Sequence, residues 1–183
     1  MISRSEALNL LNSYIKDKRL LKHCLAVEAI MRRLAEKLNE EIELWGLTGL
    51  LHDIDYEVVS GDMSKHGLEV VNIVKNKLPS SALEAIKSHN ERLGVISNSK
   101  ISKALRAADH LSGLIIATAL VMPNKKLSEV TVKSLMKKFK QKDFASGINR
   151  LRIQTCIEIG LTLEEFLEIG LEALQKIHLD LEL

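Results

Sequence analysis

Two aspartates and two histidines interrupt segments that are otherwise apolar. His52 and Asp53 are adjacent and end a predicted apolar helix, where a buried charge is costly without a partner. Asp109 lies inside another predicted helix whose remaining inward positions are apolar, and His23 is followed on its helical face by apolar residues four and seven positions later. Imidazole nitrogens and carboxylate oxygens are ligands of divalent metals, so these residues predict metal chemistry.

Each residue alone has a simpler interpretation. A single buried histidine can be a hydrogen-bonded core residue, and either aspartate could pair with Arg106 or Arg32. Taken together, three or four such side chains from separate helices can close around one ion and leave a position for water. Two further histidines, His66 and His89, could serve a second ion if Asp53 bridged both.

The elements that must position these residues are predicted to be helices. Apolar residues repeat at spacings of three and four along most of the chain, and two prolines with 3% aromatic residues leave little material for a β-sandwich. The fold class is therefore predicted to be all-α. The first helix is opened by a capping box of Ser3 and Glu6, and the others are expected at about 17–38, 41–52, 64–78, 81–89, 100–120, 129–140, 147–157 and 163–178.

The composition excludes several classes of protein. With 183 residues, of which 46% are hydrophobic and 27% charged, the chain fits one ordinary globular domain. The net charge of +2 disfavours a general nucleic-acid binder. No apolar run is long enough for a membrane span, and the first residues lack the apolar core of a signal peptide, so we expect a cytoplasmic protein. Cys24 and Cys156 are expected to be reduced, buried fillers.

Charge is unevenly distributed in the last third of the chain. Residues 121–156 hold nine Lys or Arg against two Asp or Glu, whereas residues 157–183 hold one against seven. Two explanations are open: helices that pair through opposite charges, or a basic rim for an anionic substrate.

The ordered set of His23, His52-Asp53 and Asp109 resembles the signature of the HD-domain metal-dependent phosphohydrolases. With His66 and His89 added, the pattern is similar to the six-ligand variant that holds two metals. The sequence His52-Asp53-Ile54-Asp55 resembles the HDIG type, with Asp55 in place of the usual glycine. Residues 108–114 and 138–150 extend the resemblance to a subfamily of small predicted HD hydrolases. It implies a helical bundle with metal ligands on facing helices.

The resemblance also implies a role for each of these positions. The first metal would be held by His23, His52, Asp53 and Asp109, and the second by His66 and His89, with Asp53 shared and central to catalysis. Two cations about 3.5–4 Å apart can bind phosphate oxygens and turn a water into hydroxide near neutral pH. Iron or manganese is favoured as the metal, with zinc, cobalt and nickel as alternatives. Residues 1–183 would form a single HD domain, with a metal-binding core at about 17–122 and a helical extension at 126–183.

Substrate contacts beyond the metals are harder to predict. Within the basic segment 125–152, Lys138 and Arg150 are candidates for phosphate contacts, although a solvated helix face explains most of these cations. Ser112 shares the helical face of Asp109, where its hydroxyl could meet substrate. Asp55 and Glu57 are either proton carriers or ordinary loop acids. His110 and His178 receive no role.

The leading functional hypothesis is the hydrolysis of a phosphate ester, in a nucleotide or nucleotide-like small molecule, by metal-activated water. One alternative is a di-iron HD-type oxygenase that cleaves a C–C or C–P bond. Another is a non-catalytic module that binds a nucleotide. A phosphorylated small molecule is thus the expected partner, nucleic acid and membrane are disfavoured, and the sequence does not indicate an oligomeric state.

Overall fold

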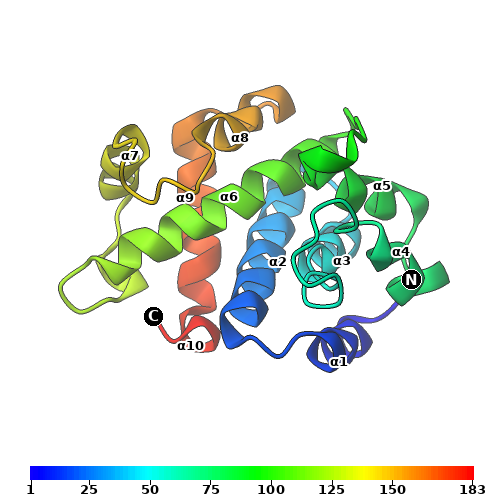
Figure 1. Ribbon diagram of the computed structural model, residues 1–183. Coiled ribbons are helices and arrows are strands. Elements are labelled where there is room, and N and C mark those ends of the chain that lie inside the picture. The colour runs from blue at the N-terminus through cyan, green and yellow to red at the C-terminus, as the bar shows by residue number, and fades with distance from the viewer.

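The computed structural model describes all residues, 1–183, and contains helices but no strands, which confirms the all-α prediction. Figure 1 shows their arrangement. The α-helices are α1 (Arg4–Tyr14), α2 (Lys18–Leu38), α3 (Ile42–Leu51), α4 (Glu69–Val74), α5 (Ser80–His89), α6 (Lys100–Leu120), α7 (Val132–Lys140), α8 (Arg150–Gln154), α9 (Leu163–Lys176) and α10 (His178–Leu181). No helix is long and apolar enough to span a membrane.

Helices α2 and α3 pack very closely because α3 presents glycines to α2. A Cβ atom on Gly49 would lie 2.9 Å from the carbonyl oxygen of Val27, and one on Gly46 would lie 2.6 Å from the side chain of Arg32. Buried Glu28 stabilises the same region, since it accepts hydrogen bonds from Arg4 on α1 and from Arg32. The close approach holds the middle of α2 against α3.

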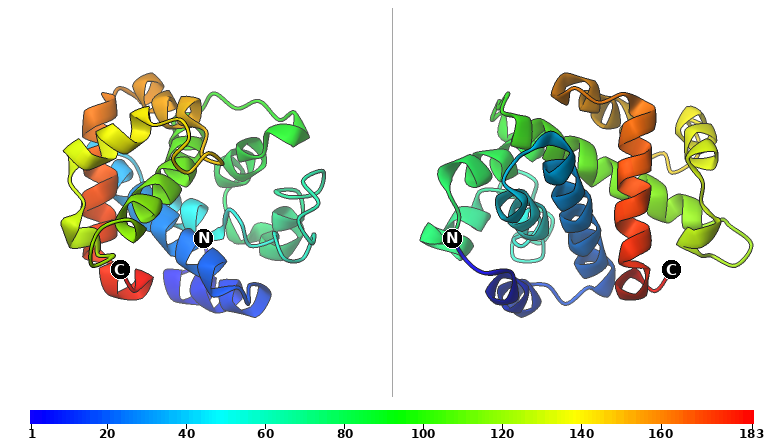
Figure 2. Two further views of the ribbon diagram at one scale, coloured as in Figure 1. Left: turned by 60° about the vertical axis from the view of Figure 1, so that its left-hand side comes forward. Right: turned by 180° about the vertical axis from the view of Figure 1, so that it is seen from behind.

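The long helix α6 crosses both α2 and α9, as the views from the front and from behind show (Figures 1 and 2). Its inward face is apolar, with Leu105, Leu111 and Ile115 fully buried. At the crossing with α9, a Cβ on Gly170 would lie 2.5 Å from the side chain of Leu111. Glycine therefore permits a close contact here too. Helix α6 packs against most of the other helices, namely α2, α3, α5, α7, α8 and α9.

Several helix ends follow the capping signals of the sequence. The side chains of Ser3, Asp17, Ser99 and Thr162 each accept a hydrogen bond from a backbone N–H in the first turn of the helix that follows. Ser3 and Thr162 form complete capping boxes with glutamates three residues later. These caps place α1, α2, α6 and α9 close to their predicted positions.

Other boundaries differ from the prediction. Residues 52–68 form successive turns, so the helix expected from Ser64 begins only at Glu69, and it gives way to a 3-10 turn at Lys75–Lys77. Helix α5 begins one residue before Ser81, after Pro79, and no side chain caps it. In the tail, the helices expected at 129–140 and 147–157 are shortened to α7 and α8, each adjoining a 3-10 helix, at Leu127–Glu129 and Thr155–Ile159.

Candidate metal centre

The six polar residues singled out in the sequence come from five separate parts of the fold and meet at one place. His23 lies in the second turn of α2, and His52 and Asp53 directly follow α3. His66 lies in the turn before α4, His89 is the last residue of α5, and Asp109 lies in the middle of α6. His52 is fully buried and the remaining five are buried or half-buried.

Asp53 is the centre of this cluster. Its Oδ1 lies 3.3 Å from the Nε2 atoms of His52 and His66 and 3.4 Å from that of His89. Its Oδ2 lies 3.6 Å from Nε2 of His23, which is also 3.2 Å from Oδ1 of Asp109. The two oxygens of Asp53 therefore face different sets of histidines.

The cluster contains two groups of three residues, and within each group the three ligand atoms lie within 4.8 Å of one another. The first consists of His23, His52 and Asp109, and the second of His52, Asp53 and His89. His66 adjoins the second group, because its Nε2 is 3.0 Å from that of His89. The donor set is therefore nitrogen and oxygen without thiolate, which suits a catalytic divalent metal better than a cysteine-rich structural site.

The outer ring nitrogens of His52 and His89 both face backbone oxygens. Nδ1 of His52 lies 2.7 Å from the carbonyl of Gly49, and Nδ1 of His89 contacts the carbonyl of Ile86. A carbonyl can only accept, so each Nδ1 carries a proton. In a neutral imidazole this leaves Nε2 with a bare lone pair directed into the cluster.

The other two histidines also have acceptors at Nδ1. That of His66 lies 2.8 Å from a carboxylate oxygen of Asp55. That of His23 lies 3.1 Å from the hydroxyl of Ser112, which donates its own proton to the carbonyl of Asp109 and therefore accepts from the ring.

All four Nε2 atoms thus converge, with 3.2 Å between those of His23 and His52. Facing lone pairs at such distances repel each other unless a proton or a metal ion lies between them, and the donor set fits a bound metal.

The electrostatics of the cluster attract positive charge. Burial alone would raise the pKa of Asp53 and of Asp109, but the surrounding histidines hold both well below the usual range. Burial lowers the pKa of His52 to about 4, so its ring is neutral near pH 7. Burial opposes protonation of His66 as well, yet hydrogen bonds to Asp53 and Asp55 raise its pKa to about 9. In the metal-free protein, a proton on the His66 ring would supply part of the positive charge that a metal ion would otherwise bring.

The simpler interpretation of the aspartates as partners of arginines is wrong. Arg32 pairs with Glu28 and Glu43, and Arg106 donates to the carbonyl of Ser97. Neither guanidinium forms an ion pair with Asp53 or Asp109.

The two acids that follow the His-Asp pair have structural partners. Asp55 is completely buried and accepts hydrogen bonds from His66 and from the backbone of Gly67 and Val70. Glu57 accepts from the backbone N–H groups of Lys16 and Asp17 at the start of α2.

A cleft of about 340 Å³ opens onto the cluster, and its lining includes residues that the sequence reasoning missed. Besides Asp53, Asp109, His66 and His89, it is lined by Tyr56, Met63, Asn90, Glu91, Arg92 and His110. Arg92 is exposed and forms no ion pair, and the ring of Tyr56 packs edge-on against His66. Burial lowers the pKa of His110. In the sequence, the only signal for these residues is that each lies within three positions of Asp53, His66, His89 or Asp109.

The three residues expected to contact substrate are engaged elsewhere in this structure. Ser112 is completely buried behind His23. The guanidinium of Arg150 donates to the backbone carbonyls of residues 141, 144, 145 and 148, and so fastens the segment that leads into α8. The ammonium of Lys138 lies 4.3 Å from the centre of the Phe144 ring.

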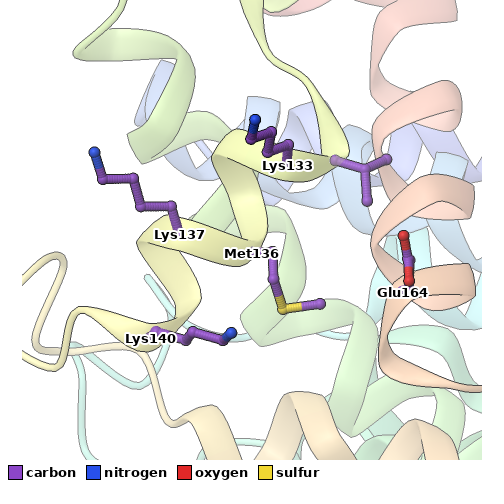
Figure 3. A pocket seen from close by; sticks show the side chains of 6 residues that line it. Lys133, Met136, Lys137, Lys140 and Glu164 are labelled. Carbon is purple, nitrogen blue, oxygen red and sulfur yellow. The ribbon is translucent and has the colours of Figure 1, made fainter.

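The lysines of α7 line a separate groove beside α9, shown in Figure 3. Lys133, Lys137 and Lys140 extend from α7, with Met136 between the helices and Glu164 on α9 opposite. No ion pair joins residues 121–156 to the acidic residues 157–183. Three glutamates of the latter segment pair with earlier parts of the chain, in Lys22–Glu182, Arg33–Glu172 and Lys103–Glu158. The opposite charges therefore do not hold these helices together.

Comparison with known proteins gives one match. The model of the HD-domain family matches residues 20–114, which include all six residues of the cluster. Neither the curated proteins nor the solved structures contain a match to this chain. Members of the matched family are typically metal-dependent phosphohydrolases. With the family match covering over half of its length and a histidine-aspartate cluster between its helices, the chain belongs to the HD-domain family.

Proposed function

We propose that this protein is a metal-dependent hydrolase of phosphate esters, acting on a nucleotide or nucleotide-like small molecule. The observation that carries the proposal is the convergence of four imidazole Nε2 atoms and two carboxylates beside an open cleft. A purely structural metal site would be closed to solvent. The cleft is lined by four of the six clustered residues, Asp53, His66, His89 and Asp109, and so gives a phosphate group access to them.

His23, His52, Asp53 and Asp109 would hold one divalent ion, and His66, His89 and the other oxygen of Asp53 a second. Such ions would polarise the phosphate oxygens and lower the pKa of a water between them. The contribution of Asp53 is to face both groups, since its two oxygens point to different histidines. His52, neutral near pH 7, keeps its lone pair available for a metal.

The lining of the cleft favours a small anionic substrate. Arg92 lines the cleft and has no carboxylate partner, so it would contact a phosphate oxygen or another anionic group of the substrate. Tyr56 offers a half-exposed ring against which a base or another flat group could stack. The volume of about 340 Å³ lies at the lower end of the range of small-molecule sites.

Three earlier candidates take supporting roles in this proposal. Ser112 would orient His23 through its hydroxyl instead of meeting substrate. Arg150 and Lys138 would shape residues 141–149, which pack against α6 where Ile148 contacts Gly113. None of the three is needed at the phosphate.

The test is a comparison of wild type with Asp53→Asn over a panel of nucleotides and nitrophenyl phosphate mono- and diesters, with manganese, iron, cobalt or zinc supplied. We expect wild type to release phosphate or alcohol from at least one ester, and the variant to lose roughly a hundredfold or more of that rate together with bound metal. Asp143→Asn, which removes an exposed acid without a partner, is the control and should match wild type.

Equal turnover by Asp53→Asn and wild type would refute the proposal. Activity that requires both iron and oxygen, with no anaerobic release of phosphate, would assign the same ligands to the oxygenase alternative. Tight nucleotide binding without turnover under every condition would point to the non-catalytic module.

A further inference from the structure

We propose that Asp55 is a positioning residue for the second metal: it holds His66 in the tautomer and orientation that this ion requires. The inference rests on the proposed metal-dependent function and assigns a role to a residue that touches neither substrate nor metal. Asp55 stands where the HDIG pattern has glycine, so the role would belong to this chain and not to the pattern.

The contacts of Asp55 are divided between its two oxygens. Oδ1 lies 2.8 Å from Nδ1 of His66. Oδ2 accepts hydrogen bonds from the backbone N–H of Gly67 at 2.7 Å and of Val70 at 3.3 Å. One oxygen therefore orients the ring, and the other fixes the turn that carries it. Gly67 has φ of +88°, a left-handed conformation that suits glycine at this turn.

The turn is also held from its other side. The side-chain amide of Asn90, itself buried, donates to the carbonyls of Met63 and His66 at 2.7 and 2.8 Å. With its backbone fastened by Asn90 and its ring by Asp55, His66 has little freedom to turn Nε2 away from Asp53 and His89.

His66 is the only one of the four clustered histidines whose Nδ1 faces a carboxylate. Those of His52 and His89 face backbone carbonyls, and that of His23 faces a hydroxyl. A carboxylate behind a metal-binding histidine fixes its tautomer and makes the ring a stronger ligand.

This matters most at the second position, because its only direct carboxylate, Asp53, is shared with the first. Asp55 supplies a further negative charge one hydrogen bond behind the ligand.

Asp55→Asn separates the two functions of this side chain. With its amide oxygen in the place of Oδ2, asparagine keeps the bonds from Gly67 and Val70. Its NH₂ group then replaces Oδ1 and donates to Nδ1 of His66, which moves the ring proton to Nε2 and removes the lone pair from the cluster. The matched control is Glu57→Gln, an acid two residues later that contacts only the backbone of Lys16 and Asp17.

The experiment is a titration of metal-free protein with Co²⁺, followed by visible absorption and by metal analysis after gel filtration. We expect two equivalents in wild type and in Glu57→Gln. In Asp55→Asn the weaker equivalent should lose about 10–100-fold in affinity, while the affinity of the tighter one stays unchanged. A merely structural role would instead weaken both equivalents together.

Two outcomes overturn the inference. If Asp55→Asn bound two equivalents with unchanged affinity, Asp55 would not position the ligand. The proposed function would still stand in that case, provided that wild type hydrolyses a phosphate ester. Fewer than two equivalents in wild type would remove the second position itself.

Should Asp55→Asn not fold, zinc-loaded wild type answers the question by ¹⁵N NMR of its histidine side chains. The Nδ1 proton of His66 should then lie further downfield than those of His52 and His89, and absence of a proton at this nitrogen would contradict the inference.

Discussion

The stability of the metal-free protein should depend on pH because of His66. Its pKa, lowered by burial but raised more by Asp53 and Asp55, is about 9, against about 6.5 for an unperturbed histidine. A group whose pKa is raised on folding stabilises the folded state fully below the unfolded value, and this stabilisation is lost as the pH rises through the folded value. The contribution of His66 should therefore disappear between about pH 6.5 and 9.

We expect the free energy of unfolding of metal-free wild type to fall by about 1–3 kcal/mol over this interval, measured by urea denaturation at several pH values. In His66→Gln the fall should be smaller, because the raised pKa of His66 no longer contributes to it, although that of His23 still acts in the same direction. His52 does not interfere, because its lowered pKa affects stability only below about pH 6.5. Parallel curves for the two proteins would contradict this explanation.

Residue types and their order in the chain were enough to select the six clustered residues. Asp109 and the His52-Asp53 pair are conspicuous because a polar group inside an apolar helix needs a partner. The supporting residues could not be found in this way. In the sequence Asp55 resembles an ordinary loop acid. In the structure its complete burial and its hydrogen bonds to residues 11 to 15 positions later distinguish it from Glu57.

At the scale of elements, the cluster depends on the separation of α2 and α3. Gly49 allows α3 to approach so closely that an added Cβ would meet the Val27 carbonyl at 2.9 Å and the side chain of Met31 at 3.0 Å. A backbone atom cannot move aside, so Gly49→Ala must push the helices apart. Because His23 lies on α2 and His52 at the end of α3, we expect both stability and metal binding to suffer.

We predict that Gly49→Ala lowers the free energy of unfolding by about 1–3 kcal/mol, measured by urea denaturation, and weakens metal binding in a competition titration. Gly147→Ala is the matched control, because a Cβ there meets nothing within 4 Å and no positive φ is required. If Gly49→Ala matched this control in both measurements, the close packing would not set the geometry of the cluster.

Helices with side-chain caps were predictable, and the segment before α4 was not. The starts of four helices are marked by residues that cap them locally, namely Ser3, Asp17, Ser99 and Thr162. Residues 64–68 also fit a helical pattern, but their backbone groups bond to side chains elsewhere in the fold, including those of Asp55 and Asn90. Such tertiary bonds override local propensity and leave no trace in periodicity.

At the scale of the whole molecule, the net charge is only +2, yet charged side chains line two separate surfaces. The cleft over the cluster is lined by residues of the turns, of α6 and of the end of α5, whereas the lysine groove lies between α7 and α9. Of the two explanations for the uneven charge, the pairing of these helices through opposite charges is not observed, because three acidic side chains of the C-terminal segment pair with helices α2 and α6 instead. Which residues form ion pairs depends on their positions in the folded chain, and the number of charges in a segment does not reveal those positions.

The most direct test of the central claim is the metal content of anaerobically purified and reconstituted protein, measured for wild type and for the double variant His66→Ala/His89→Ala. Two adjoining groups of ligands, with the two oxygens of Asp53 facing different histidines, predict about two ions per chain in wild type and about one in the variant. Iron in wild type would direct the next assays to oxygen-dependent chemistry beside the phosphate-ester panel. One ion or fewer in reconstituted wild type, or equal contents in the two proteins, would contradict the dinuclear centre.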